Sequence, residues 1–344
     1  GDSMRSDKII KVLVVDDSIV FRELLSLGIS SEPTIKVVAT AKDPFDARDK
    51  ILQYEPDVIT CDVEMPKMNG IEFIRRLIPQ YSIPVIIVSS ISDAVFDAMD
   101  AGAVDFVVKP DMDKLKSIEQ FICEMIEKIK IASTARIVRN KAKSAIYSDN
   151  AHVSYDSGKI IAIGASTGGT EAIHKILKDM PSTTPGIVIV QHIPPVFSRM
   201  FAERLNSSTN LEVKEANTGD YVEQGKVLVA PGNKHMRIRK VSERYKVECF
   251  EGYKVNGHCP SVDVLFESVA KEAGKNAVGV ILTGMGYDGA KGLLSMRRKG
   301  AQTIGQDEES SVVYGMPKVA YNIGAVSKQL SLDRIASAIL EMIR

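Results

Sequence analysis

The sequence lacks an excess of charge of either sign. Its 344 residues include 44 Lys and Arg and 44 Asp and Glu, so the formal net charge is zero. A protein that binds nucleic acid generally carries a basic excess. The composition therefore argues against nucleic acid as a partner.

The sequence also lacks a long hydrophobic run. No apolar stretch approaches the roughly 18 residues that a membrane-spanning helix needs, and the N-terminus has no apolar segment typical of a signal peptide. These absences predict a cytoplasmic protein without direct membrane insertion. The four cysteines (Cys61, Cys123, Cys249 and Cys259) show no C-x-x-C spacing, which favours free thiols in a reducing compartment.

What the sequence does contain is enough apolar material for folded domains. Hydrophobic residues make up 44% and charged residues 26%, which is ordinary for a globular protein and excludes a mainly disordered chain. The length suggests two domains. We expect one domain over 8–130, a linker rich in Ala, Ser, Asn, Lys and Arg over 131–158, and a second domain over 159–344.

Both predicted domains alternate strand-like and helix-like segments, which predicts parallel sheets covered by helices on both faces. In the first domain, Gly28 is expected to stop a helix that begins at Ser18, and Asn69-Gly70 opens another. The stretch Gly219–Gly257 of the second domain is expected to form a β-hairpin insertion. The first-domain strands are expected over 11–15, 36–40, 58–61, 84–88 and 106–108. Those of the second domain are expected over 160–163, 186–190, 226–229, 278–282 and 302–304.

Polar side chains follow the predicted strands of the first domain where each strand ends. They are Asp16 and Asp17, Asp62, Ser89 and Lys109. Because ligands sit at the carboxyl ends of the strands in an open parallel sheet, these groups are expected to converge. Clustered carboxylates repel one another unless a hard cation such as Mg2+ neutralises them. A neighbouring lysine and hydroxyl suit the oxygens of a phosphoryl group.

These motifs resemble the receiver domain of two-component response regulators, over about 8–130, and the resemblance implies a flavodoxin-like (βα)5 fold. By this resemblance, Asp62 accepts a phosphoryl group. Asp17, Asp62 and the Glu64 backbone carbonyl bind Mg2+, and Asp16 assists. The matching segments are Val-Val-Asp16-Asp17-Ser, Cys-Asp62-Val-Glu-Met-Pro-Lys-Met-Asn-Gly, Val-Ser89-Ser and Val-Val-Lys109-Pro110.

The same resemblance implies roles for three further side chains. Lys109 would hold the phosphoryl oxygens, and Ser89 stands at the switch hydroxyl position. Phe106 stands at the switch aromatic position, which is often a tyrosine.

A serine in the second domain lies on a strand–turn–helix segment. Gly164-Ala-Ser166-Thr-Gly168 satisfies the G-x-S-x-G pattern of a nucleophile elbow. The following helix N-terminus offers N–H groups to a developing oxyanion. The alternative is an N-cap serine in an ordinary glycine-rich turn.

A serine nucleophile needs a base and a group that orients the base. His192 follows the strand next to that of Ser166, and Asp288 follows a later strand, so both are expected at the same sheet edge. His235 and His258 are weaker candidates for the base. His152 lies in the linker, and His174 is too far along its helix to reach back.

The segment around Asp288 also permits another interpretation. Gly284-Met-Gly286-Tyr-Asp-Gly289 satisfies G-x-G-x-x-G, and Asp307 follows at about the spacing of a dinucleotide-binding site. That interpretation would leave Ser166 and His192 without a role.

The second half resembles the catalytic domain of the CheB family of chemotaxis protein-glutamate methylesterases, a doubly wound parallel-sheet α/β domain. By this resemblance, Ser166 is the nucleophile, His192 the base and Asp288 its orienter, while Thr167 and Met285 flank the oxyanion site. The matching segments are 164–169, Gln191-His192, Ala230-Pro-Gly232, 260–266, 283–289 and Tyr314-Gly-Met-Pro317.

The family resemblance implies a serine hydrolase that demethylates chemoreceptor glutamates, releases methanol and deamidates receptor glutamines. Its expected partners are the chemoreceptors and the histidine kinase CheA as phosphodonor. Mg2+ is expected in the receiver, with no cofactor for ester hydrolysis. The unphosphorylated receiver is expected to cover the esterase cleft until phosphorylation of Asp62 loosens the packing.

Two other classes of function remain open. One is a receiver joined to a binding module whose Ser/His/Asp set is vestigial. The other is a receiver with a DNA-binding output, but the neutral, glycine-rich second half offers neither a helix-turn-helix nor a basic face.

The nucleophile assignment predicts the effect of one substitution. Ser166→Ala should reduce methanol release from a methylated receptor by about 10³-fold or more, because loss of a triad nucleophile removes the covalent route. Turnover at the wild-type rate would contradict the assignment.

Overall fold

The structure, a computed structural model, describes residues 8–65, 69–137 and 153–344. The chain divides into two compact units, Gly1–Arg139 and Asn140–Arg344, called here the N-terminal and C-terminal units. Residues 138–152, which include His152 and much of the expected linker 131–158, lie outside the described residues.

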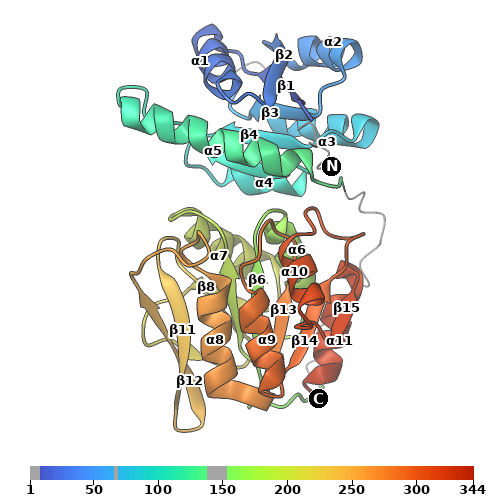
Figure 1. The fold of residues 1–344 in the computed structure, drawn as a ribbon. Coiled ribbons are helices and arrows are strands. Elements are labelled where there is room, and N and C mark those ends of the chain that lie inside the picture. Colours follow the sequence, from blue (N-terminus) through green and yellow to red (C-terminus); the bar gives the residue numbers. More distant parts are fainter. Residues whose placement is uncertain (1–7, 66–68, 138–152) are drawn as a thin grey trace, which may run out of the picture. The chain divides into compact units, whose positions relative to one another are not determined.

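The N-terminal unit is built on a five-stranded parallel sheet with the order β2-β1-β3-β4-β5 (Figure 1). The central strands are almost entirely buried, as helices on both faces require. The expected flavodoxin-like (βα)5 fold is confirmed. Its elements are β1 (Ile10–Val15), α1 (Ile19–Ser30), β2 (Ile35–Ala41), α2 (Pro44–Tyr54), β3 (Val58–Asp62), α3 (Gly70–Tyr81), β4 (Val85–Ser89), α4 (Ala94–Asp100), β5 (Asp105–Val108) and α5 (Leu115–Ser133).

Short polar side chains cap the first three helices of this unit, α1, α2 and α3. Ser18 Oγ accepts a hydrogen bond from a backbone N–H in the first turn of α1, and Asp43 does the same for α2. Asn69 caps α3 in this way, as the sequence predicted. These caps satisfy N–H groups that have no partner within the helix.

The expectation that Gly28 ends the first helix is wrong, because α1 continues to Ser30. A Cβ at position 28 would lie 2.4 Å from Ile122 Cδ1 and 2.8 Å from Ile122 Cγ1 on α5. The glycine therefore allows α1 and α5 to approach closely.

The C-terminal unit contains a seven-stranded sheet with the order β15-β14-β13-β6-β7-β10-β8, and all its strand pairs are parallel. The expected doubly wound fold is confirmed. The terminal strands β8 and β15 were not predicted from the sequence, because both are short and largely exposed. The strands are β6 (Ile160–Ala165), β7 (Ile187–Gln191), β8 (Glu212–Glu215), β10 (Lys226–Val229), β13 (Ala277–Ile281), β14 (Gln302–Gln306) and β15 (Lys328–Leu330).

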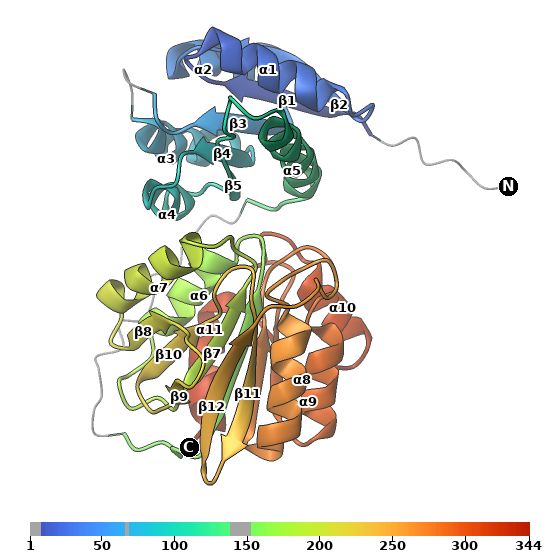
Figure 2. The ribbon, with the colours of Figure 1, turned by 90° about the vertical axis from the view of Figure 1, so that its left-hand side faces the viewer.

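Helices cover both faces of this sheet (Figure 2). One group contains α6 (Gly169–Lys178), α7 (Phe197–Ser208) and α11 (Leu332–Met342). The other group contains α8 (Val262–Ala273), α9 (Ala290–Arg298) and α10 (Met316–Asn322). A single 3-10 turn, η1 (Gly274–Asn276), follows α8.

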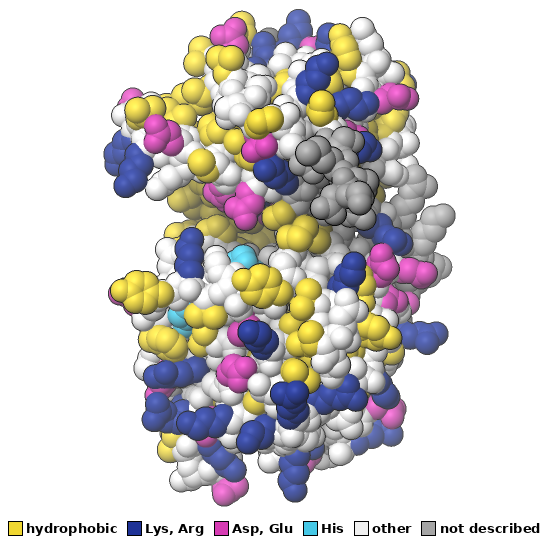
Figure 3. Space-filling model, viewed as in Figure 1, with side chains coloured by type: hydrophobic (Ala, Val, Ile, Leu, Met, Phe, Trp, Pro, Cys, Tyr) yellow, Lys and Arg dark blue, Asp and Glu magenta, His cyan; other side chains and the backbone are white. Residues whose placement is uncertain are grey.

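The predicted hairpin is present as a separate antiparallel sheet in the order β11-β12-β9. It consists of β9 (Tyr221–Val222), β11 (His235–Val241) and β12 (Arg244–Phe250). Basic side chains gather over the part of the C-terminal unit where this hairpin lies (Figure 3). Several pair with acids, such as Arg237 Nε with Glu248 at 2.7 Å.

In both sheets the chain reverses its direction of strand addition beside the first strand. The reversal lies between β1 and β3 in one unit and between β6 and β13 in the other. Such reversals open a crevice at the carboxyl ends of the strands, where ligands bind. Among residues 8–65, 69–137 and 153–344, no helix combines the length and apolar character needed to cross a membrane.

The contact at Gly28 predicts an inverted effect of a helix-favouring substitution. At an open helical position, Gly→Ala stabilises by about 1 kcal/mol. Here Gly28→Ala should instead lower the free energy of unfolding by about 1 kcal/mol, because the methyl group overpacks against Ile122. Urea unfolding followed by circular dichroism measures the change. The double variant Gly28→Ala/Ile122→Ala is the matched control, and a stabilised single variant would contradict the packing argument.

Candidate functional site

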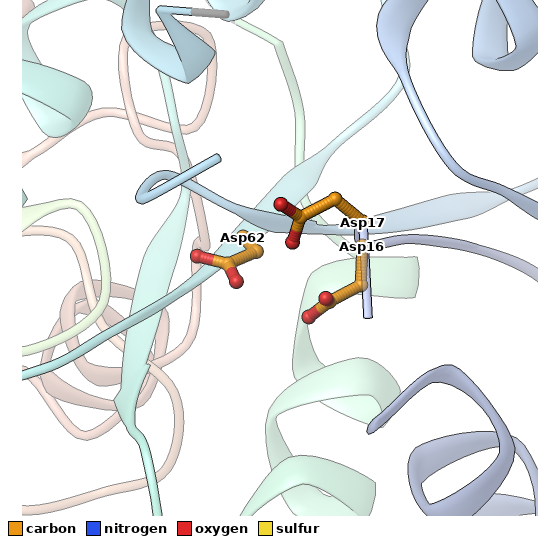
Figure 4. A group of neighbouring side chains, drawn as sticks. All are labelled: Asp16, Asp17 and Asp62. Carbon is orange, nitrogen blue, oxygen red and sulfur yellow. The ribbon is translucent and has the colours of Figure 1, made fainter. Parts of the chain in front are cut away.

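Three carboxylates meet at the carboxyl edge of the N-terminal sheet. Asp16 and Asp17 follow β1, and Asp62 ends β3, the neighbouring strand across the reversal. Their oxygens lie within 4.8 Å of one another (Figure 4). Asp16 and Asp62 are buried, whereas Asp17 is exposed.

The electrostatics of this cluster show unbalanced negative charge. Burial, helped by the neighbouring Asp62 and Asp17 charges, raises the pKa of Asp16 to about 7 despite a hydrogen bond from the Ser18 backbone. Three oxygen donors with surplus negative charge are the ligand set that Mg2+ prefers. These residues therefore fit a divalent cation.

Lys109 lies beside the cluster at the end of β5. Its Nζ is 3.0 Å from Asp62 Oδ2 and 3.1 Å from Glu64 Oε2. Burial by itself lowers the pKa of Lys109, but its hydrogen bonds with these two carboxylates outweigh burial and raise it. The lysine is therefore charged and faces the oxygens of Asp62.

The side chain of Glu64 has surroundings that the sequence did not indicate. The resemblance assigned only its backbone carbonyl. In the structure its carboxylate accepts hydrogen bonds from Lys109 Nζ, the Ser90 N–H at 3.0 Å and Ser89 Oγ at 3.2 Å. The Glu64 carboxylate thus accepts from Ser89 and Lys109, the two side chains that were expected to bind phosphoryl oxygens.

Phe106 lies on β5, at the position expected for the switch aromatic side chain. Lys128 Nζ is 5.2 Å from the centre of its ring and 2.6 Å from its carbonyl oxygen. The ring therefore packs beside a lysine that also pairs with Asp105.

In the C-terminal unit, three side chains from separate strand ends come to one edge of the sheet. Ser166 follows β6, His192 follows β7, and Asp288 lies in the turn between β13 and α9. Strand register sets the first two, since Ala165 is aligned with Gln191 and the His192 N–H donates to the Ala165 carbonyl. Gln191 Nε2 also donates to the Ser166 carbonyl at 2.8 Å.

Asp288 holds His192 within a dense set of hydrogen bonds. His192 Nε2 lies 2.7 Å from Asp288 Oδ2, and the side chains are 7% and 1% exposed. The other donors to Asp288 are the Val262 and Asp263 N–H groups, Ser261 Oγ and Asn256 Nδ2.

The donors to Asp288 reverse the effect of burial on its charge. Burial by itself raises the pKa of Asp288, but the hydrogen bond and charge of His192, together with Asn256 and the Val262 N–H, lower it far below its usual range. Val262 and Asp263 are in the first turn of α8, whose unpaired N–H groups favour an anion. Asp288 is therefore an ionised, immobile acceptor.

The other ring nitrogen of His192 is available for a proton. Nδ1 is buried and has no hydrogen-bond partner among the described residues. No described hydrogen bond joins it to Ser166, and catalytic hydrogen bonds are often loose without substrate. Because Asp288 occupies Nε2, Nδ1 is the nitrogen that can serve as a base.

Backbone N–H groups close to Ser166 suit an oxyanion. Within the described residues, the N–H groups of Thr167 and Met285 have no acceptor. Thr283 Oγ1 donates to the Thr167 carbonyl at 2.9 Å and fixes that turn. At Gly284 a Cβ would lie 2.6 Å from Ser166 Cβ, so only glycine lets the Met285 segment approach the serine.

Of the other described histidines, His258 contacts His192 directly, His235 contacts a neighbour of Asp288, and His174 pairs with α7. The His258 ring stacks on His192, with centroids 3.6 Å apart. His235 Nε2 lies 2.7 Å from the Tyr253 carbonyl, and its Nδ1 accepts from the Ser261 N–H. His174 Nε2 lies 3.0 Å from Ser208 Oγ.

The alternative dinucleotide motif is also accounted for by local contacts. Asp288, inside it, is bound by the donors described above. Asp307 Oδ1 accepts hydrogen bonds from the N–H and hydroxyl of Ser310. Both oxygens of Asp288 and one oxygen of Asp307 are therefore already engaged.

Sequence reasoning missed Asn256, Ser261 and Asp263, which surround Asp288. Asn256 lies in an Asn-Gly turn, and Ser261 is the N-cap of α8. The signals available were the cap pattern before a predicted helix and, for Ser261 and Asp263, their place in the matching segment 260–266. Nothing local linked either residue to Asp288, 32 and 27 positions away.

Comparisons with known proteins match both halves of the chain. The family described as CheB methylesterase matches residues 161–339, and the response regulator receiver domain matches residues 12–119. A protein-glutamate methylesterase/protein-glutamine glutaminase 2 of Syntrophomonas wolfei is 58% identical, over 97% of this chain and 98% of its own length.

A Salmonella typhimurium protein-glutamate methylesterase/protein-glutamine glutaminase is 46% identical, over 97% of both chains. Among solved structures, the Thermotoga maritima CheB methylesterase catalytic domain is 36% identical, with a TM-score of 0.53. It covers 54% of this chain, and all of that domain is matched.

The contacts of Glu64 lead to a prediction for the acidic pocket. Two unit charges about 4 Å apart interact by about 1 kcal/mol even in water. Glu64→Gln should therefore speed phosphorylation of Asp62 by acetyl phosphate about fivefold, by removing repulsion and releasing Lys109. The initial rate of phosphoprotein formation with Mg2+ measures it. Glu72→Gln, on the exposed surface of α3, is the control, and an unchanged or slower rate for Glu64→Gln would refute competition.

Proposed function

Because the chain belongs to the CheB methylesterase family and carries a response regulator receiver domain, we propose that it is a phosphorylation-activated esterase acting on chemoreceptors. Its enzyme class is protein-glutamate methylesterase and protein-glutamine glutaminase. The observation that carries the mechanism is the contact of His192 Nε2 with the buried, ionised Asp288, which leaves Nδ1 as the ring nitrogen without a hydrogen-bond partner among the described residues.

In the first half of the reaction, Ser166 Oγ attacks the γ-carbonyl carbon of a glutamate methyl ester. His192 Nδ1 takes the hydroxyl proton, and Asp288 stabilises the imidazolium that forms. The tetrahedral oxyanion is received by the free N–H groups of Thr167 and Met285. His192 then returns the proton to the departing methoxide, so that methanol leaves and an acyl-Ser166 remains.

In the second half, water replaces methanol in the same site. His192 takes a proton from the water as its oxygen attacks the acyl carbon. Collapse of the tetrahedral intermediate breaks the bond to Ser166 Oγ, which recovers its proton from His192. The products are a glutamate side chain and free enzyme. A glutamine substrate follows the same route and releases ammonia.

The N-terminal unit supplies the control of this activity. Asp62 is the proposed phosphoryl acceptor, and Lys109 and Ser89 would hold the incoming oxygens once Glu64 releases them. Asp16, Asp17, Asp62 and the Glu64 carbonyl would hold Mg2+, which neutralises charge between the carboxylates and the phosphodonor. A chemotaxis histidine kinase of the CheA type is the proposed donor.

Control requires that phosphorylation of one unit changes the activity of the other. We propose that the unphosphorylated receiver restrains the esterase and that phosphorylation shifts the population towards an unrestrained state. A phosphoryl group changes Asp62 from an acceptor of Lys109 into a larger, more highly charged ligand, so the contacts at the carboxyl edge must change.

The experiment that tests the function measures methanol released from a methylated chemoreceptor by the full-length protein with Mg2+. Acetyl phosphate should raise the rate in the wild type and have no effect in Asp62→Asn, because that amide cannot form the acyl phosphate. No release at all, with phosphorylation of Asp62 confirmed by mass spectrometry, would support a non-enzymatic binding module.

Truncation separates esterase activity from its control. A chain without residues 1–150 should release methanol faster than the unphosphorylated full-length protein. Equal or slower release would contradict restraint by the receiver while leaving the esterase assignment in place.

A further inference from the structure

His258 lies against the proposed catalytic base, His192. Its ring is parallel to that of His192 within 8°, and the ring centroids are 3.6 Å apart. The His258 ring makes no hydrogen bond with any residue in the described part of the chain. Its contact with the site is therefore the flat face of the ring.

His192 needs a second constraint because, among the described residues, its side chain has one hydrogen bond. Nε2 is bound to Asp288, while Nδ1 has no partner in the same part of the chain. A ring held at one nitrogen can still rock about that contact, and rocking moves Nδ1 relative to Ser166. A parallel ring in van der Waals contact blocks this movement on one side.

The turn that carries His258 is itself fixed by the site. Val255 and His258 exchange backbone hydrogen bonds of 2.9 and 3.0 Å. Asn256 and Gly257 between them both have positive φ, 55° and 81°, which matches the Asn-Gly preference of a type I′ turn.

Asn256 ties this turn to the carboxylates below it. Its Nδ2 donates to Asp288 Oδ1 at 2.9 Å and to Asp263 Oδ2 at 2.6 Å. The residue that positions Asp288 therefore also sets the height of the His258 ring above His192.

Charge also suits His258 to this place. Burial, helped by the His192 and Lys254 charges and opposed by Asp288, lowers the pKa of His258 to about 4. Around neutral pH the ring is uncharged and does not repel His192 when that residue takes a proton. A lysine or arginine at this position would do so.

We propose that His258 is a positioning residue: its neutral ring stacks on the His192 imidazole and holds it with Nδ1 towards Ser166. The proposal rests on the proposed esterase function, since it concerns the orientation of that base. His258 itself takes no proton from the substrate and forms no bond with it.

The test uses the full-length protein and a reagent that reports the base independently of the receptor. An alkyl fluorophosphonate modifies an activated serine: a bond forms between Ser166 Oγ and phosphorus, the phosphorus–fluorine bond breaks, and His192 receives the hydroxyl proton. Mass spectrometry follows the modification. His258→Ala should slow it by about 10- to 100-fold, since displacing a catalytic group by about 1 Å costs up to that much. His258→Phe, which keeps a flat ring, should remain close to the wild type.

A second readout reports the His192 ring directly. Nitrogen-15 spectra of the histidine rings should show one tautomer for His192, with hydrogen on Nε2, in the wild type and in His258→Phe. In His258→Ala the two ring nitrogens should become partly averaged. Tyr253→Ala is the matched control, because this side chain is on the same loop, is 96% exposed and should leave both readouts unchanged.

The outcomes separate the two proposals. Unchanged serine modification and unchanged His192 signals in His258→Ala would overturn the positioning role, whatever the receptor assay shows. If serine modification is slowed equally in His258→Phe and His258→Ala while the His192 signals stay normal, the positioning role is also overturned, because the imidazole nitrogens of His258 would then be needed.

A separate outcome concerns the substrate. If the wild type releases no methanol but its serine modification still depends on the His258 ring, the receptor substrate is rejected and the positioning role is retained. With receptor as substrate, His258→Ala should lower kcat and leave KM unchanged.

Discussion

The proposed esterase site depends on one buried carboxylate, Asp288. An ionised group in a low-dielectric interior is costly unless its lone pairs are satisfied. Here the first turn of α8, the Asn256 turn and His192 all donate to it. α8, the 255–258 turn and His192 are thus all joined through the charge of Asp288. Removing it would leave several buried donors without an acceptor, so its structural and chemical roles cannot be separated.

The acidic pocket of the N-terminal unit shows the opposite balance. Asp288 is surrounded by donors, whereas Asp16 is buried close to the buried Asp62 and the exposed Asp17, and burial together with these charges raises its pKa to about 7. Lys109 offsets only part of this charge and divides its contacts between Asp62 and Glu64. The charge of Asp288 is balanced by the donors around it, whereas the negative charge of the acidic pocket is only partly balanced. The acidic pocket is therefore suited to receive a cation and a phosphoryl group. This difference suits the proposed roles, a fixed catalytic centre and a control site that changes state.

Much of the fold could be predicted because strong local patterns agree with it. Each of these patterns lies within a few consecutive residues. Examples are the buried strand segment 160–163, the capped helix start at Asn69-Gly70, and the polar residues that follow the strands. The exceptions have a common cause. Gly28 was expected to end a helix, but the decisive contact is with Ile122 on α5, 94 positions away. The edge strands β8 and β15 were missed because short, exposed strands have little hydrophobic pattern.

By itself, the sequence determined the two α/β units and the family to which the chain belongs. It also determined that Ser166, His192 and Asp288, and likewise Asp16, Asp17 and Asp62, lie at or after the ends of strands. These follow from periodicity and from the rule that parallel strands end at one edge. Only the tertiary structure decided which nitrogen of His192 faces Asp288, that Asn256 bridges Asp288 and Asp263, that His258 stacks on His192, and that the Glu64 side chain binds Lys109. The physical reason is that hydrogen bonds and ring contacts act over a few ångströms, between residues that the sheet brings together from distant parts of the chain.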